Sequence, residues 1–162
     1  MNTITETTSG EMDLVLREEK AGIATLTLNR PTSRNPLSSD MMMQLQANLD
    51  ELKENERIKV VIITGSGQAF CAGHDLKEIR SNNRREIFDK LLAQCSKLMT
   101  SIVRLPKPAI ARVHGIATAA GCQLVASCDL AISSSEAVFA TPGVNIGLFC
   151  STPMVAVSRK VN

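Results

Sequence analysis

The sequence contains no tryptophan and no tyrosine, and its only aromatic residues besides two histidines are four phenylalanines. Proteins that bind single-stranded nucleic acid stack bases on aromatic side chains, and proteins that bind duplexes present a strongly basic surface. The formal net charge of this chain is only +2. The composition therefore argues against a nucleic acid as the partner.

The cysteines form no CxxC pair, and their number is odd, at five. Zinc sites and disulfide frameworks need paired or regularly spaced cysteines, so both are disfavoured, and no metal site is predicted. We expect reduced and mostly buried thiols, as in a cytosol-like compartment. The cysteines are Cys71, Cys95, Cys122, Cys128 and Cys150.

No apolar run approaches the length of roughly 20 residues that a membrane-spanning helix needs. Residues 1–11 are polar and mildly acidic, without the apolar core of a signal peptide or the arginines of a transit peptide. We therefore expect a flexible tail over 1–11, no membrane span and a cytoplasmic protein. A mitochondrial location is the alternative if the natural N-terminus lies further upstream.

The remaining residues, 12–162, have the composition of a single globular domain, with 44% apolar and 21% charged residues in the whole chain. Strands are predicted within 13–28, 58–64, 109–115 and 129–133. Helices are predicted over 39–54, 87–102 and 122–127, with another beginning near Thr152. Because strands and helices alternate, we predict an α/β fold with a largely parallel sheet.

The stretch "AFCAGHDLKEI" at 69–79 passes from small buried residues through Gly73 into a charged helix start. A second small-residue turn, "IATAAGC" at 116–122, also lies between a predicted strand and a helix. Backbone N–H groups at two such turns can converge on one oxygen and stabilise negative charge on it. Tight turns that need small residues for packing alone explain the pattern equally well, and the residues leave both interpretations open.

These motifs resemble the crotonase, or enoyl-CoA hydratase/isomerase, superfamily. The resemblance is carried by "TLNRPTSRNPLS", "AFCAGHDLKEI", "KPAIARVHGIATAAGCQLVASCDLAIS" and "FATPGVNIGL", and it is strongest to the enoyl-CoA hydratase domain-containing group. It implies a ββα spiral core, acyl-CoA thioester substrates of fatty acid metabolism, and an oxyanion hole for the thioester carbonyl. The implied donors are the backbone N–H groups of His74 and Ala120. Position 120 is often glycine in the family.

The resemblance also implies where coenzyme A would lie, as part of the substrate and not as a bound cofactor. The loop of His74, Asp75, Leu76 and Lys77 would follow the CoA arm, with Arg34 beside it. Independently of the resemblance, we expect the Asp75 side chain to cap the helix that follows.

Both glutamates that hydratases of this superfamily use for acid/base chemistry are replaced. The first position holds Gln123 and the second holds Gly143, where glycine is a candidate for positive φ. A later slot used by isomerases and dehalogenases falls near Ser151, which is also neutral. Gln123 can hydrogen-bond a water molecule but cannot accept its proton.

Other reactive groups each have a structural alternative. The His74 imidazole could enter the pocket, face solvent or bond a neighbouring turn. Cys122 could be a thiolate at a helix start or a packed thiol. Arg84 and Arg85 could meet CoA phosphates or form a solvated helix face. Neither His114 nor Cys150 has an evident role.

Three functions follow from this pattern. The first is an acyl-CoA lyase or isomerase that stabilises a thioester enolate, with decarboxylation as one candidate reaction. The second is a non-catalytic acyl-CoA-binding or regulatory protein, and the third is residual hydration. The resemblance further implies C-terminal helices that build a homotrimer or hexamer. We expect these helices to be missing or truncated here, and their loss would expose an apolar face.

Overall fold

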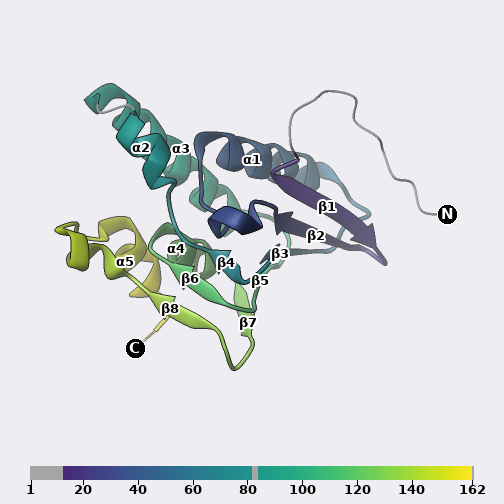
Figure 1. The fold of residues 1–162 in the computed structure, drawn as a ribbon. Coiled ribbons are helices and arrows are strands. Elements are labelled where there is room, and N and C mark those ends of the chain that lie inside the picture. The colour runs from purple at the N-terminus through teal and green to yellow at the C-terminus, as the bar shows by residue number, and fades with distance from the viewer. Residues whose placement is uncertain (1–12, 82–83, 162) are drawn as a thin grey trace.

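The structure, a computed structural model, describes residues 13–81 and 84–161. The tail predicted over residues 1–11 lies outside this range. The described elements follow in chain order (Figure 1): β1 (Val15–Lys20), β2 (Ile23–Leu28), η1 (Pro31–Ser33), α1 (Ser39–Glu54), β3 (Val60–Gly65), β4 (Ala69–Cys71), α2 (Leu76–Ser81), α3 (Arg85–Val103), β5 (Ala109–Val113), β6 (Ile116–Thr118), α4 (Ala120–Ser127), β7 (Leu130–Ser133), β8 (Val138–Ala140), η2 (Pro142–Ile146) and α5 (Ser151–Val157).

Two sheets organise the chain. The larger sheet has the strand order β1-β2-β3-β5-β7, and the smaller has the order β4-β6-β8. Among the described strands, only the β1–β2 pair is antiparallel. Both residues of its tight turn, Ala21 and Gly22, have positive φ, at 51° and 80°. Positive φ at both positions is the geometry of a type I′ hairpin turn. The prediction of a largely parallel α/β fold is confirmed.

A repeating unit builds the spiral. Each unit contributes one strand to the larger sheet and one three-residue strand to the smaller sheet, and it ends in one or two helices. The first unit is β3, β4 and α2–α3, the second is β5, β6 and α4, and the third is β7, β8 and α5. This confirms the ββα spiral. The simple strand–helix alternation predicted above was wrong, because it omitted β4, β6 and β8. Residues 116–118, interpreted as part of a turn, form β6, a strand too short to show a period.

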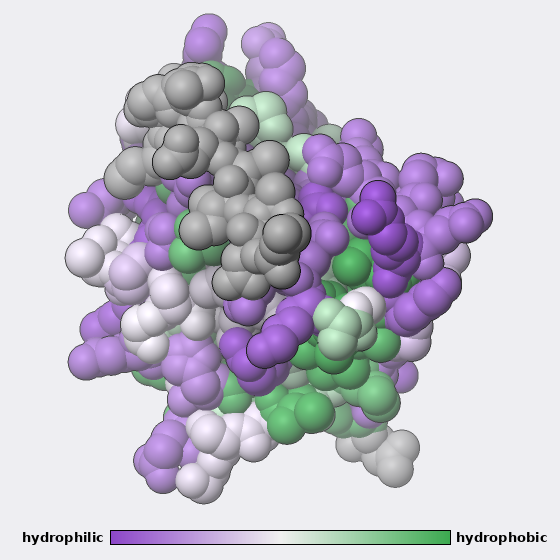
Figure 2. Space-filling view, turned by 90° about the vertical axis from the view of Figure 1, so that its right-hand side faces the viewer, coloured by the Kyte–Doolittle hydropathy of each residue, from purple (hydrophilic) through white to green (hydrophobic). Residues whose placement is uncertain are grey.

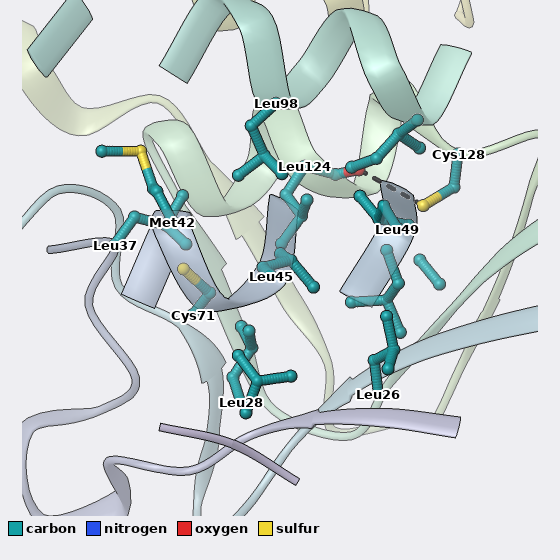
Figure 3. Packing of buried hydrophobic residues seen from close by; sticks show 14 of the residues in the cluster. Leu26, Leu28, Leu37, Met42, Leu45, Leu49, Cys71, Leu98, Leu124 and Cys128 are labelled. Atoms are coloured by element: carbon teal, nitrogen blue, oxygen red, sulfur yellow. Dashed lines mark hydrogen bonds between the residues drawn. The ribbon is translucent and has the colours of Figure 1, made fainter. Parts of the chain in front are cut away.

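The core lies between the larger sheet and the helices. Helix α1 packs on β1 and β2 and alongside α3, and Figure 3 shows the side chains of β2, α1, α3 and α4 meeting there. The five apolar residues that predicted α1 are all buried, at 0–1% exposure: Met41, Met42, Leu45, Leu49 and Leu52. The Ser38 side chain begins the helix by accepting a hydrogen bond from the Met41 N–H, at 3.2 Å. Among the described residues, no helix combines the length and apolarity needed to span a bilayer.

Candidate functional site

The two small-residue turns singled out in the sequence lie against each other. One connects β4 to α2 through Gly73, and the other connects β6 to α4 through Ala119. The Thr118 hydroxyl donates to the Ala72 carbonyl at 3.1 Å. A Cβ atom placed on Gly73 would lie 3.0 Å from the Ala119 Cβ and 3.4 Å from the Ala120 nitrogen. The segments before α2 and α4 therefore form one joined surface.

The backbone N–H groups of His74 and Ala120 are both left without an acceptor at these turns, within the described part of the chain. The Leu37 N–H donates to the Gly73 carbonyl at 2.7 Å, and the Asp75 N–H donates to the Leu37 carbonyl at 3.4 Å. Since the residues on either side of His74 bond to Leu37, the His74 N–H faces away from it. Ala120 is the first residue of α4, where an N–H has no intrahelical acceptor. Within 13–81 and 84–161, neither N–H donates a hydrogen bond.

The turn before α4 is conformationally strained. Ala119 has φ 50° and ψ −120°, a region that residues with a side chain rarely adopt. Its N–H donates to the Ala140 carbonyl of β8 at 2.9 Å, and its carbonyl accepts from the Gln123 N–H at 3.0 Å. Such strain persists where the surrounding structure holds the residue in place. Both anchors fix the direction of the next peptide, which carries the Ala120 N–H.

The His74 imidazole lies against the Leu37 carbonyl, with Nδ1 at 3.4 Å from the oxygen. Burial lowers the pKa of His74 below its ordinary value, against smaller raising effects from that carbonyl and from Glu78. The ring is therefore neutral near pH 7. Of the three interpretations, contact with a neighbouring turn describes this placement.

Asp75 caps α2, as predicted. Its Oδ1 accepts from the Lys77 N–H at 3.0 Å and from the Glu78 N–H at 3.3 Å. Its Oδ2 forms an ion pair with Arg30 at 2.9 Å. Burial tends to raise the pKa of Asp75, but the hydrogen bond from Arg30, the two N–H bonds and the Arg30 charge outweigh it and lower the pKa. Asp75 is thus an ionised structural anchor of the turn.

The remaining residues expected along the CoA arm are exposed. Leu76 and Lys77 occupy the first turn of α2, and Arg34 lies in the loop after η1. The Arg34 carbonyl accepts from the Ala72 N–H at 3.0 Å, which places this loop beside the candidate donors. Arg84 precedes α3, and Arg85 forms an exposed ion pair with Asp89 at 3.7 Å. Contact of any of these residues with CoA stays a prediction.

Gln123 is buried in α4, and its Oε1 accepts a hydrogen bond from the Thr152 hydroxyl of α5 at 3.0 Å. Gly143 is buried in η2 and does not have positive φ, so that part of the expectation was wrong. Glycine is required there for space, because an added Cβ would lie 2.6 Å from the Cys150 Sγ and 2.8 Å from the Leu148 carbonyl oxygen. Ser151 is exposed at the start of α5.

The cysteines are free, and four of the five are buried, as expected. Burial raises the pKa of Cys122, with a smaller effect from Cys150. A raised pKa opposes thiolate formation and supports packing as the role of Cys122. His114 has a partner that the sequence did not suggest, since its Nε2 lies 2.8 Å from the Gly67 carbonyl oxygen. Among the described residues, no three His, Cys, Asp or Glu side chains gather in an arrangement suited to a metal.

Three residues that help to build the site were missed in the sequence. Arg30 pairs with Asp75, and Thr152 bonds Gln123. Asn35 is fully buried and joins three backbone groups, accepting from the Arg30 N–H and donating to the Ser66 and Ala69 carbonyls, all at 2.8 Å. The "NRPTSRNP" stretch, rich in turn residues, was the only local signal for Arg30 and Asn35.

Large apolar residues are exposed on the elements that follow α4. Figure 2 shows apolar residues gathered in the lower right part of the face that it draws. The exposed large apolar residues of β7, β8 and the segment that follows are Leu130, Ile132, Val138, Phe139, Val144, Ile146, Leu148 and Phe149. Exposed apolar residues in such number are typical of regions that other protein segments cover.

The fold and the site together define an α/β protein of the ββα spiral class, with two free backbone donors at adjacent strand ends. Comparison with known families gives the same class: residues 18–161 match the family described as enoyl-CoA hydratase/isomerase. The chain belongs to this family.

Similar proteins support the assignment. The mitochondrial enoyl-CoA hydratase domain-containing protein 3 of Danio rerio is 49% identical over 91% of this chain and 51% of its own length. The structure of an enoyl-CoA hydratase from Mycobacterium smegmatis is 55% identical with a TM-score of 0.89, over 92% of this chain and 58% of that one. The structure of human enoyl-CoA hydratase domain-containing protein 3 is 46% identical with a TM-score of 0.87, over 90% of this chain and 58% of that one. The chain spans about half the length of the curated relatives it matches.

Proposed function

We propose that the protein binds an acyl-CoA thioester and stabilises the charge that develops on the thioester oxygen when an enolate forms. The donors are the backbone N–H groups of His74 and Ala120. The observation that carries this proposal is that both N–H groups lack an acceptor within 13–81 and 84–161 and belong to turns in direct contact. Membership of the enoyl-CoA hydratase/isomerase family supports the choice of a CoA thioester.

Backbone donors suit this task because they are held by the fold. Removing one donor from an oxyanion hole costs roughly 10²–10³ in turnover. The donor at position 120 is a main-chain group, so alanine serves as well as glycine. CoA acts as part of the substrate, and the exposed side chains of Arg34, Leu76 and Lys77, with Asp75 as the anchor of their loop, are proposed to line its arm.

The chemistry proposed is that of a lyase or isomerase acting through an enolate, not two-glutamate hydration. Gln123 and Gly143 occupy the two glutamate positions, and neither can transfer a proton. Decarboxylation fits such a site, because loss of CO₂ creates the enolate directly and needs an oxyanion donor more than a base. The same substitutions also favour a second candidate, a non-catalytic acyl-CoA-binding or regulatory protein.

Two variants test the donor pair. Ala120→Pro deletes one N–H at the first position of α4 and should abolish thioester binding measured by titration calorimetry, with circular dichroism to check that the variant folds after the strained Ala119. His74→Ala keeps its N–H and should retain affinity within a few-fold. Equal loss in both variants would instead assign the role to the imidazole. Mass spectrometry on enoyl-, β-hydroxyacyl- and malonyl-type CoA esters distinguishes an enzyme from a binder.

For the whole protein we also propose a homotrimer or a hexamer. The exposed apolar residues of β7 and β8 support an assembly that covers them. Sedimentation that finds a stable, active monomer would refute it. Because the similar proteins of fish, rat and human are named as mitochondrial, a mitochondrial location is proposed beside the cytoplasmic one, and imaging of the tagged protein decides between them.

A further inference from the structure

Helix α2 follows the turn that carries the His74 N–H, and little apolar packing holds it in place. The helix has six residues, Leu76–Ser81, and none of them is buried. Ile79 is partly buried and packs against the core. Because a helix of this length is marginal without tertiary packing, the position of α2 depends strongly on its polar contacts.

One side-chain hydrogen bond joins α2 to another helix. The Glu78 Oε2 accepts from the N–H of Ser39, the first residue of α1, at 3.0 Å. A carboxylate suits this place, since the N-terminus of a helix carries partial positive charge. In the described part of the chain, no other side chain of α2 hydrogen-bonds beyond the helix and the turn before it. Glu78 is therefore the single polar tether between α2 and α1.

The tether lies at the meeting point of three helices. The Ser39 carbonyl accepts from the Gln94 Nε2 of α3 at 2.7 Å, while the Ser39 N–H donates to Glu78 of α2. Residues of α1, α2 and α3 also line one small cavity there: Ser39, Glu78, Ile79, Ile87, Phe88 and Leu91. Ser39 thus fixes Glu78 to a part of the fold that is itself held in place.

The segment before α1 runs beside the turn before α2. Leu37 and His74 pair as a parallel bridge, and the Leu37 N–H donates to the Gly73 carbonyl at 2.7 Å. Ser39 lies two residues after Leu37, and Glu78 lies four residues after His74. The bond from Ser39 to Glu78 therefore closes the other end of the same junction, and α2 cannot rotate about the turn without breaking it.

We propose that Glu78 is a positioning residue that, by accepting from the Ser39 N–H, holds α2 so that the His74 N–H points at the thioester oxygen. The inference rests on the function proposed above and adds a residue that acts through another. Hydrogen bonds weaken steeply as the donor turns away from the acceptor. A donor at the start of an untethered α2 would therefore bind the oxygen less well, although the donor itself remains present.

The test compares two ligands that differ only at the carbonyl. Butyryl-CoA carries the thioester oxygen, whereas S-butyl-CoA, a thioether of the same length, has none. Titration calorimetry should show that the unmodified protein prefers butyryl-CoA by about tenfold, the effect of one or two hydrogen bonds. Glu78→Ala should reduce this preference to about threefold or less while keeping the affinity for S-butyl-CoA within about twofold. An equal loss of affinity for both ligands would overturn the inference, because a merely structural role predicts it.

Matched variants test the same bond from both sides. Glu78→Gln keeps a side-chain oxygen that can accept, and should keep the preference. Ser39→Pro deletes the donor at the first position of α1, where proline is well tolerated, and should lower the preference as Glu78→Ala does. Ser38, which precedes it, has φ −75° and ψ 165°, an extended conformation that suits a residue before proline.

A control separates the tether from the stability of α1. The Ser38 hydroxyl caps α1 by accepting from the Met41 N–H at 3.2 Å, and it does not contact α2. Ser38→Ala should therefore lower the free energy of unfolding, measured with urea, and leave the preference for butyryl-CoA unchanged. A loss of preference in Ser38→Ala equal to that in Glu78→Ala would overturn the inference.

Failure of the inference differs from failure of the proposed function. Circular dichroism confirms that each variant is folded, and Ser39→Pro alone decides the test if Glu78→Ala unfolds. A preference for butyryl-CoA that survives in the folded variants would overturn the role of Glu78 and leave the proposed donors intact. If the unmodified protein binds butyryl-CoA and S-butyl-CoA equally, or binds neither, the donor pair itself fails, and the role of Glu78 fails with it.

Discussion

Gly73 and Ala119 lie so close that a Cβ atom on Gly73 would be 3.0 Å from the Ala119 Cβ. This close approach joins the two turns that carry the candidate donors, although the two residues lie 46 positions apart in the sequence (119 minus 73). Gly73 has φ of +93° and Ala119 has φ of 50°, so both turns are bent where they meet. The spacing of the two N–H groups therefore depends on a glycine at position 73.

Replacing Gly73 by alanine should weaken both stability and thioester affinity. The added methyl group meets Ala119 and is strained at positive φ, so we expect a loss of about 1–3 kcal/mol in the free energy of unfolding. Gly147→Ala is a matched control, because Gly147 also has positive φ but no atom within 4 Å of an added Cβ. Urea denaturation measures stability, and calorimetry measures affinity. Loss of affinity in both variants would show that the contact does not determine the donor spacing.

The sequence predicted the long elements well because each carries many aligned apolar residues. Helix α1 was predicted from Ser39 to about Glu54, and the structure has the same bounds. The three-residue strands β4, β6 and β8 could not be predicted, since two or three residues show no period. Their existence depends on pairing with one another across distant parts of the chain, as Ala69 does with Ile116.

The site was predicted unevenly for a similar reason. Asp75 was identified as a cap because a cap is a local pattern, and its N–H partners lie two and three residues away. The ion pair joins Asp75 to Arg30, 45 positions away, and the hydrogen bond joins Gln123 to Thr152, 29 positions away. No local sequence pattern predicts contacts over such separations. Gly143 was explained by backbone conformation, whereas the reason for it is the nearby Cys150, which only the fold reveals.

Asp75 should stabilise the fold in a pH-dependent way. Its pKa is lowered in the folded protein, so its contribution is fully present above the ordinary aspartate pKa of 3.8 and is lost as the pH falls through the lowered value. Asp75→Ala should cost about 1 kcal/mol at pH 7 through the lost cap. Asp75→Asn retains a capping oxygen and loses only the charge. Urea denaturation at several pH values checks this, and an Asp75→Asn deficit that persists unchanged well below pH 3.8 would contradict it.

The cysteines should differ in reactivity according to burial. Burial raises the pKa of Cys71 and Cys128 to about 12 and that of Cys95 to about 11, so all three are neutral thiols at pH 7. Alkylation requires the thiolate and access to it. We expect iodoacetamide to modify the half-buried Cys150 first, as read by peptide mass spectrometry of the native protein. Labelling of Cys71 as fast as Cys150 would show that the core opens readily.

Crotonyl-CoA hydration by the unmodified protein should be absent or very slow. A positioned acid or base contributes about 10²–10⁴-fold to turnover, and neither Gln123 nor Gly143, at the two positions proposed for the hydratase carboxylates, can supply one. Residues that act together are not additive, so the loss need not be the product of two such factors. The reaction is measured by the loss of absorbance of the enoyl thioester. Turnover at the rate of an ordinary hydratase would contradict this prediction and would indicate that another group activates water.

Restoring carboxylates should succeed at position 123 and fail at position 143. Gln123→Glu keeps an oxygen that accepts from the Thr152 hydroxyl, at 3.0 Å in the present protein, and adds a proton acceptor, so hydration should rise measurably.

Gly143→Glu brings a Cβ to 2.6 Å from the Cys150 Sγ and 2.8 Å from the Leu148 carbonyl oxygen. Since the carbonyl belongs to the backbone and cannot rotate away, even Gly143→Ala should lower the free energy of unfolding by about 1–3 kcal/mol. Thermal denaturation of both variants measures this. A double variant that is as stable as Gln123→Glu alone and hydrates faster would contradict the steric argument, because it would require η2 to move and admit the second glutamate.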